Sequence, residues 1–213
     1  MARKSRPARK VAGKKTVKKP AKIKAKTKAE TKTKAAKTKL TEAKTAQTKP
    51  AKAATKEPAN KLAVGANAPD FSLPRDGGGT VSLADFAGQN LALYFYPRAD
   101  TTGCTKEAID FSQLRDAFAK ANTQVVGVSA DPVPAQDRFK AKYKLAIALA
   151  SDEKHRMLEA YGVWQEKSLY GRKFMGIVRS TFLIGRDGRV ARIWPKVFVD
   201  GHADEVLAAA KAL

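Results

Sequence analysis

A single cysteine, Cys104, is the residue of this 213-residue chain that is best placed to do chemistry. It follows a six-residue apolar run at residues 91–96, which is long enough for a buried strand. Pro97 closes the run, and residues 100–103 supply turn and helix-capping chemistry. A thiol in the first turn of the following helix lies beside unpaired backbone N–H groups and the positive end of the helix dipole, and both favour the thiolate. Because the thiolate is the nucleophile, the segment predicts a reactive cysteine.

The alternative is that the thiol is a small apolar group buried for packing, as lone cysteines often are. The Gly-Cys-Thr-Lys sequence around Cys104 is polar and includes Lys106, so we expect the thiol to be open to solvent. Apolar residues then recur every three or four positions, which predicts one helix with a buried stripe: Ala108, Phe111, Leu114, Phe118 and Ala121.

The elements that must position this cysteine alternate between strands and helices. The sequence predicts a short hairpin within residues 71–83, strands at 124–129, 146–149, 180–184 and 190–194, and helices at 135–143, 154–161 and 203–212. Residues 161–175 are expected to form a loop near the site. This alternation indicates a single α/β domain over residues 63–213, about the usual size of one domain.

The segment YFYPRADTTGCTKEAIDF resembles the active-site segment of the peroxiredoxins, most closely the bacterioferritin-comigratory or peroxiredoxin Q branch. Further matching segments follow in order at residues 125–132, 149–190 and 194–207, so the resemblance extends from about Val64 to the C-terminus. It implies a thioredoxin-like fold, with a central mixed sheet flanked by helices. It also implies a thiol-dependent peroxidase that reduces hydrogen peroxide and organic hydroperoxides without a cofactor.

The resemblance also implies roles for named residues. Cys104 would attack the peroxide O–O bond and become a sulfenic acid. Thr101 would hold the thiolate and the peroxide in line, and Arg179 would place its guanidinium against the sulfur. Pro97 would shield the sulfur from bulk water. Glu107 also matches a family position, but the resemblance gives it no firm role.

The chain departs from the family pattern at two positions. Thr102 replaces a usual proline, which should leave the turn less rigid. Ile109 stands where many members of this branch carry a resolving cysteine, and the chain has no other cysteine. The sequence therefore predicts a one-cysteine enzyme, a monomer or weak dimer, reduced by an external thiol such as thioredoxin, glutaredoxin or a small thiol. Two Cys104 residues could alternatively pair between chains.

The N-terminal segment, residues 1–62, carries nearly all of the net charge. It contains 22 lysine or arginine residues and three acidic residues, so it contributes +19 of the chain's +22. It has no aromatic residue and too few large aliphatic residues to bury a core, which predicts a disordered tail. Such a polycation binds DNA or RNA without reading sequence. The candidate contacts are Lys14, Lys15, Lys18, Lys19, Lys22, Lys24, Lys26 and Lys28.

A second function class remains open on this evidence: a DNA-binding or compacting protein whose peroxiredoxin domain turns over slowly as a redox sensor. The sequence has no apolar stretch for a secretory signal or a membrane span, and its single cysteine suits a reducing compartment. We therefore expect the protein in the cytoplasm, on the nucleoid of a bacterium, or in the nucleus of a eukaryote. His155 and His202 are expected at the surface or at helix ends without a metal, and Trp164 and Trp194 in the core or at a pocket rim.

Overall fold

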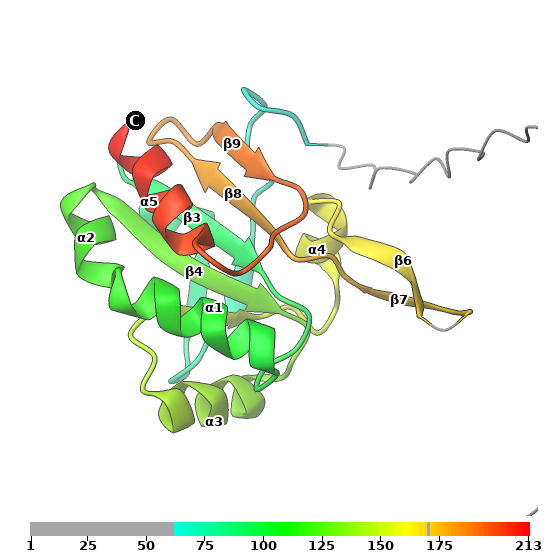
Figure 1. Ribbon diagram of the computed structural model, residues 1–213. Coiled ribbons are helices and arrows are strands. Elements are labelled where there is room, and N and C mark those ends of the chain that lie inside the picture. The colour runs from blue at the N-terminus through cyan, green and yellow to red at the C-terminus, as the bar shows by residue number, and fades with distance from the viewer. Residues whose placement is uncertain (1–61, 170) are drawn as a thin grey trace, which may run out of the picture. The chain divides into compact units, whose positions relative to one another are not determined.

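A computed structural model describes residues 62–169 and 171–213 of the protein (Figure 1). Apart from Leu62, the basic tail predicted over residues 1–62 lies outside these ranges, as do its eight candidate lysines. The strands are β1 (Ser72–Pro74), β2 (Thr80–Ser82), β3 (Asn90–Phe95), β4 (Thr123–Ser129), β5 (Ala148–Ser151), β6 (Trp164–Leu169), β7 (Arg172–Ile177), β8 (Ser180–Ile184) and β9 (Val190–Trp194). The helices are α1 (Thr102–Gln113), α2 (Arg115–Lys120), α3 (Val133–Tyr143), α4 (Arg156–Ala160) and α5 (His202–Lys211), with a 3₁₀ turn at Leu83–Phe86.

Five strands form the central sheet in the order β5-β4-β3-β8-β9. Strands β3, β4 and β5 run parallel, whereas β8 pairs antiparallel with β3 and β9 pairs antiparallel with β8. The short β1–β2 hairpin is a separate two-stranded sheet, as the sequence predicted for residues 71–83. The mixed sheet flanked by helices confirms the predicted α/β class.

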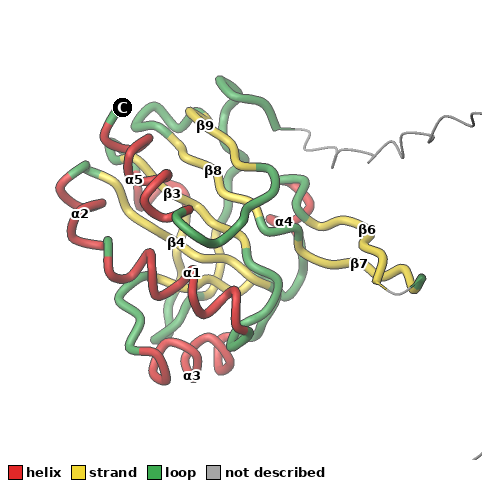
Figure 2. The backbone as a smooth tube through the Cα atoms, in the orientation of Figure 1, coloured by secondary structure: helices red, strands yellow, loops and turns green. Residues whose placement is uncertain are grey.

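Strand β3 is the centre of the fold and is buried on both faces, which explains why its sequence is a continuous apolar run. Its alternate residues enter two separate core clusters. Leu91, Leu93 and Phe95 pack in the cluster that includes residues of α4 and of the β1–β2 hairpin. Ala92 and Tyr94, with Tyr96 just after the strand, pack in the cluster that includes residues of α1, α2, α3 and α5. Figure 2 shows α1, α2 and α5 in front of the sheet, with α3 beside them.

Several predicted elements differ from the structure by one or two residues at their ends, and the helix after Cys104 and strand β5 differ most. The single helix expected after Cys104 is broken at Leu114, whose backbone leaves helical geometry at φ −89° and ψ 1°. The buried stripe nevertheless continues into α2 through Phe118. Strand β5 begins two residues later than predicted, because its parallel pairing with β4 begins at Ala148, opposite Val126.

Residues 161–175, predicted as a loop, instead contribute most of a hairpin. Strands β6 and β7 pair antiparallel in a register from Trp164↔Ile177 to Leu169↔Arg172. Gly171 in the turn has a φ of +77°, which favours glycine. The hairpin extends away from the central sheet in Figures 1 and 2. The loop prediction was therefore wrong. The few apolar residues of this segment do not alternate with a period of two, so its sequence does not mark it as two strands.

Candidate active site

Cys104 is the third residue of α1, which begins just beyond the end of β3. The connecting loop is tied down at two points. The backbone N–H of Ala99 donates to Asp131 Oδ2 at 2.7 Å, and the Asp100 carboxylate accepts from Lys142 Nζ at 2.8 Å and from the hydroxyl of Tyr143 at 2.6 Å. These contacts tie the loop before α1 to the β4–α3 connection and to α3.

The thiol of Cys104 is buried, with 1% of the residue exposed, so the prediction of an open thiol was wrong. Residues distant in sequence cover it, which the local sequence could not show. It nevertheless differs from a cysteine buried only for packing. Arg179 Nη2 donates a hydrogen bond to Cys104 Sγ at 3.1 Å. A guanidinium beside the sulfur stabilises the thiolate rather than the thiol.

Arg179 lies between two acceptors in a mostly buried position, with 16% of its side chain exposed. Its Nη1 pairs with Glu107 Oε2, while its Nη2 contacts the sulfur. Burial by itself lowers the pKa of the guanidinium, but the neighbouring Glu107 and Cys104 outweigh burial and raise that pKa. Glu107 therefore holds one terminal nitrogen of Arg179 while the other contacts the sulfur, which gives a structural role to a residue that the resemblance left without one.

Glu107 is itself 1% exposed. Burial raises the pKa of its carboxyl from 4.5 to about 7, against the opposing effect of Arg179. Its Oε1 has no hydrogen-bond partner among the described residues. Burial and the ion pair with Arg179 thus act in opposite directions on the pKa of this carboxyl.

This pKa predicts a pH-dependent stability. Between pH 4.5 and about 7 the folded protein binds a proton at Glu107 that the unfolded chain has released, so the free energy of unfolding falls as pH rises through this window. In Glu107→Gln this dependence is absent. We expect the wild type to lose on the order of 3 kcal/mol relative to the variant across the window. Urea unfolding of both proteins at pH 5 and pH 8 measures it, and an unchanged difference between them would contradict the assignment.

Gly103 leaves room for the guanidinium. A Cβ at this position would lie 3.3 Å from Arg179 Nη2 and 3.9 Å from Val199 Cγ2. We expect Gly103→Ala to displace Arg179 from the sulfur and to slow Cys104 oxidation by roughly three- to tenfold. Stopped-flow oxidation measures the rate. Thr102→Ala, an exposed change in the same helical turn, is the matched control and should leave the rate unchanged; equal rates for both variants would rule out this steric role.

The other predicted site residues lie near the cysteine in sequence but are exposed. Thr101 precedes α1, and its hydroxyl donates to the carbonyl oxygen of Arg98 at 3.1 Å. Pro97 follows directly after the buried end of the apolar run that contains β3. The structure brings Cys104 and Arg179 into direct contact, and it places Thr101 and Pro97 on the loop that leads to them.

Lys167 is a cation of the site that the sequence did not reveal. It projects from β6, and its Nζ donates to the carbonyl oxygen of Ile177, two residues before Arg179. Burial lowers the pKa of the ammonium, and the nearby Arg179 lowers it further, whereas Cys104 raises it. A prediction of the β6–β7 hairpin would have revealed Lys167 as a site residue, because the hairpin places the end of β7, and Arg179 after it, beside β6.

The two histidines differ in their surroundings. His155 precedes α4 and stacks on Trp164, with ring centroids 4.0 Å apart. His202 begins α5, as expected for a helix end, but it is buried and its Nε2 lies 2.8 Å from Thr181 Oγ1. Burial lowers the pKa of His202 to about 4. Trp194 is also buried, and its indole N–H donates to Glu205, as expected for a core or rim residue.

Within residues 62–169 and 171–213, no group of three or more His, Cys, Asp or Glu side chains is arranged to hold a metal ion. In the same ranges, no helix combines the length and apolar character that crossing a membrane requires.

Comparison with known proteins identifies close relatives. The profile of the AhpC/TSA family matches residues 64–193. The putative peroxiredoxin bcp of Coxiella burnetii is 47% identical over 146 residues, which cover 68% of this chain and 97% of that protein. Peroxiredoxin Bcp of Bacillus subtilis is 42% identical over 146 residues, covering 68% of this chain and 93% of that protein. The solved structure of peroxiredoxin Q from Xanthomonas campestris is 44% identical and aligns with a TM-score of 0.66 over 71% of this chain and 96% of the other.

Proposed function

The chain belongs to the AhpC/TSA family as a peroxiredoxin, a thiol-dependent peroxidase with a thioredoxin-like fold, and from this premise we propose that it reduces peroxides through Cys104 alone. The observation that carries the proposal is the hydrogen bond of 3.1 Å from Arg179 Nη2 to the sulfur of the only cysteine. No other thiol in the chain could replace it.

In the proposed reaction, the Cys104 thiolate attacks the terminal oxygen of a hydroperoxide. The S–O bond forms as the O–O bond breaks, and the departing oxygen takes up a proton and leaves as water or an alcohol. The cysteine is oxidised to a sulfenic acid and the peroxide is reduced. Arg179 stabilises the thiolate and the negative charge that develops on the departing oxygen. The first turn of α1 adds the positive end of its dipole.

Thr101 and Pro97 complete the proposed site. The hydroxyl proton of Thr101 is directed to the carbonyl of Arg98, so the oxygen is left free to accept a hydrogen bond from the peroxide. We infer that this contact aligns the O–O bond with the sulfur. We further propose that Pro97, on the loop before α1, shields the sulfur from bulk water.

The sulfenic acid needs an external reductant. Ile109 follows Cys104 by five residues, and the sequence contains no second cysteine, so no disulfide can form within one chain. We infer reduction by thioredoxin, glutaredoxin or a small thiol acting on a monomer or weak dimer. The test is to treat the protein with one equivalent of peroxide and to trap the product with a sulfenic-acid reagent. Stoichiometric trapping and turnover only when a thiol is added would support the one-cysteine cycle. Turnover without thiol would exclude it.

We further propose that residues 1–62 hold the enzyme on DNA or RNA in the cytoplasm of a bacterium. The support is the charge of +19 in this segment, whose structure lies outside the described residues. Neutralising several phosphates makes the affinity fall steeply with salt. We expect the full chain to shift duplex DNA at low salt and residues 63–213 not to shift it, in a gel assay over a salt series. An equal shift by both proteins would contradict a role for the tail.

A further inference from the structure

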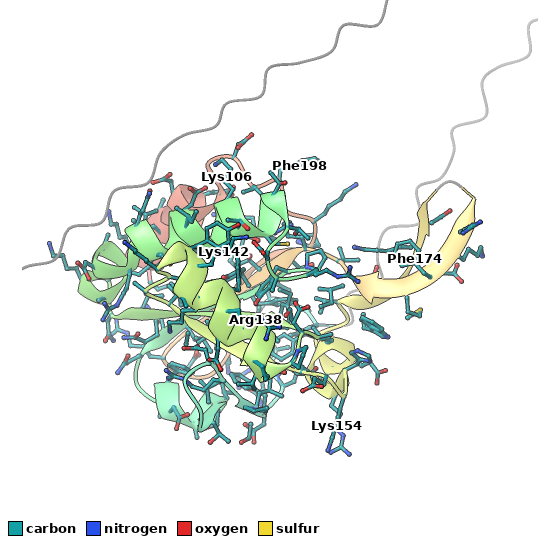
Figure 3. All side chains as sticks on the ribbon, turned by 90° about the horizontal axis from the view of Figure 1, so that it is seen from below. Lys106, Arg138, Lys142, Lys154, Phe174 and Phe198 are labelled. Carbon is teal, nitrogen blue, oxygen red and sulfur yellow. The ribbon has the colours of Figure 1, made fainter. Side chains whose placement is uncertain are left out.

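The side chain of Lys167 turns back along the β6–β7 hairpin toward the active site. Lys167 lies opposite Phe174 in the cross-strand register, yet its Nζ donates to the carbonyl oxygen of Ile177, the last residue of β7. Its stem passes Gly176, where a Cβ would lie 3.4 Å from Lys167 Cδ. Figure 3 shows Phe174 on the hairpin, which extends away from the helices. The ammonium is therefore held at the base of the hairpin, where the chain leads on to β8.

This anchor point lies two residues before Arg179, whose Nη2 contacts Cys104 Sγ at 3.1 Å. Burial lowers the pKa of the Lys167 ammonium, the like charge of Arg179 lowers it further, and Cys104 raises it. Both Arg179 and Cys104 are thus within electrostatic range of Nζ. The hydrogen bond to the carbonyl oxygen favours the charged form of the ammonium.

Lys167 differs from Lys173, the other lysine of the hairpin, in its lack of an acidic partner. Lys173 pairs with Glu166 at 3.0 Å, and its side chain is 71% exposed. Glu166 directly precedes Lys167 in β6, so its side chain points to the opposite face of the hairpin. Within residues 62–169 and 171–213, no carboxylate forms an ion pair with Lys167.

Several titratable groups packed around the sulfur contribute no net charge near neutral pH. Tyr94 of β3 and Tyr96 just after it respond to the charge of the cysteine, and burial raises the pKa of both phenols, so they stay neutral. Burial lowers the pKa of His202 in α5 to about 4, so its ring is neutral as well. On α1, Lys106 and Asp110 pair with each other at 2.9 Å.

The ion pair beside the sulfur also balances itself. Glu107, with a pKa of about 7, is largely ionised at pH 8 and then offsets the charge of Arg179. A Cys104 thiolate adds one further negative charge to this pair. Lys167 supplies a positive charge within range of the sulfur that no ion pair offsets.

We propose that Lys167 is a second cation of the active site, which stabilises the Cys104 thiolate from the base of the β6–β7 hairpin. This inference rests on the proposed function of Cys104 as the nucleophile. Lys167 acts through its electrostatic field at the sulfur and takes no part in the bond changes. Arg179 remains the cation that contacts the sulfur.

The test follows the rate of Cys104 oxidation by hydrogen peroxide in Lys167→Met between about pH 5.5 and pH 9. Methionine nearly keeps the length of the side chain and removes its charge. We expect the rate to fall by roughly three- to tenfold at the acidic end, where the thiolate is the minor form, and to stay within about twofold at the alkaline end. Lys167→Arg, which keeps the charge, should recover most of the loss. Lys173→Met is the matched control, because Glu166 already offsets that charge.

Two further measurements isolate the charge of Lys167. The same comparison in the Glu107→Gln background removes the titration of that carboxyl from the pH profile, and we expect the acidic loss to persist. The ultraviolet absorbance of the thiolate, with Cys104→Ser as the blank, should show less thiolate in Lys167→Met than in the wild type at the acidic end. This readout needs no peroxide, so slow oxidation of the wild type would count against the proposed function and leave the test of Lys167 intact.

A loss of equal size at every pH would overturn the proposal, since Lys167 would then only hold the Ile177 carbonyl and, through it, Arg179. An unchanged pH profile would overturn it as well. So would a loss that disappears in the Glu107→Gln background, or an equal loss in Lys173→Met.

Discussion

Replacement of Cys104 by serine is expected to lower peroxide turnover by at least about a thousandfold. A serine hydroxyl is far less nucleophilic and cannot form a sulfenic acid, and the chain offers no second thiol. Peroxide consumption in the presence of a thiol reductant measures the loss. Because the substitution nearly preserves the size of the side chain, the near-UV circular dichroism should remain that of the wild type. A folded variant with substantial activity would contradict the assignment of Cys104 as the nucleophile.

Replacement of Arg179 by alanine has the second largest expected effect, and it acts on both rate and stability. Loss of the guanidinium removes the cation 3.1 Å from Cys104 Sγ, and we expect the oxidation rate to fall by about 10²–10³-fold. It also leaves Glu107 buried without its partner, so the pKa of this carboxyl rises above its value of about 7 and the carboxyl binds a proton at pH 8, which costs on the order of 1 kcal/mol of stability. Stopped-flow oxidation and urea unfolding at pH 8 measure the two effects.

Two variants separate these effects of Arg179. The double variant Arg179→Ala/Glu107→Gln should regain the stability lost at pH 8, because no buried carboxyl then has to bind a proton, while the rate remains low. Arg179→Lys keeps the charge but cannot contact Glu107 and the sulfur simultaneously through two nitrogens of one planar group. We expect it to be intermediate in rate. A double variant as fast as the wild type would show that the guanidinium does not assist the reaction.

The central part of the fold was predictable because local pattern and burial agree there. The run at residues 91–96 is apolar throughout, and β3 is buried on both faces as that run indicated. The turn and capping residues before Cys104 placed the cysteine in the first turn of a helix, and it is the third residue of α1. The family resemblance supplied Arg179, which is 75 residues from Cys104 in sequence and which no local pattern could connect with it.

The parts that were not predictable depend on contacts between distant segments. Cys104 belongs to a core cluster with residues of β3, α3 and α5 and contacts Arg179, and the polar sequence around the cysteine gives no sign of these partners. The β6–β7 hairpin is held by its own cross-strand pairs and exposes Phe174 and Met175, so it lacks the buried face that would have marked it as two strands.

The burial of Cys104 also bears on how the enzyme is recycled. A peroxide is small enough to reach a sulfur that is 1% exposed, but a protein thiol needs the first turn of α1 or its preceding loop to move. Asp100 holds that loop to Lys142 and Tyr143 of α3. Reduction of the sulfenic acid by a protein thiol therefore requires this loop or the first turn of α1 to move, whereas oxidation of the thiol by a small peroxide does not.

The rate of Cys104 oxidation by hydrogen peroxide tests the central claim most directly. It can be followed by tryptophan fluorescence in a stopped-flow instrument, with the product trapped as a sulfenic-acid adduct. The account predicts oxidation at least about 10²-fold faster than that of a free thiol, lost in Cys104→Ser and strongly slowed in Arg179→Ala. A rate equal to that of a free thiol, and unaffected by Arg179→Ala, would contradict it and would favour a slow redox sensor carried on a nucleic-acid-binding tail.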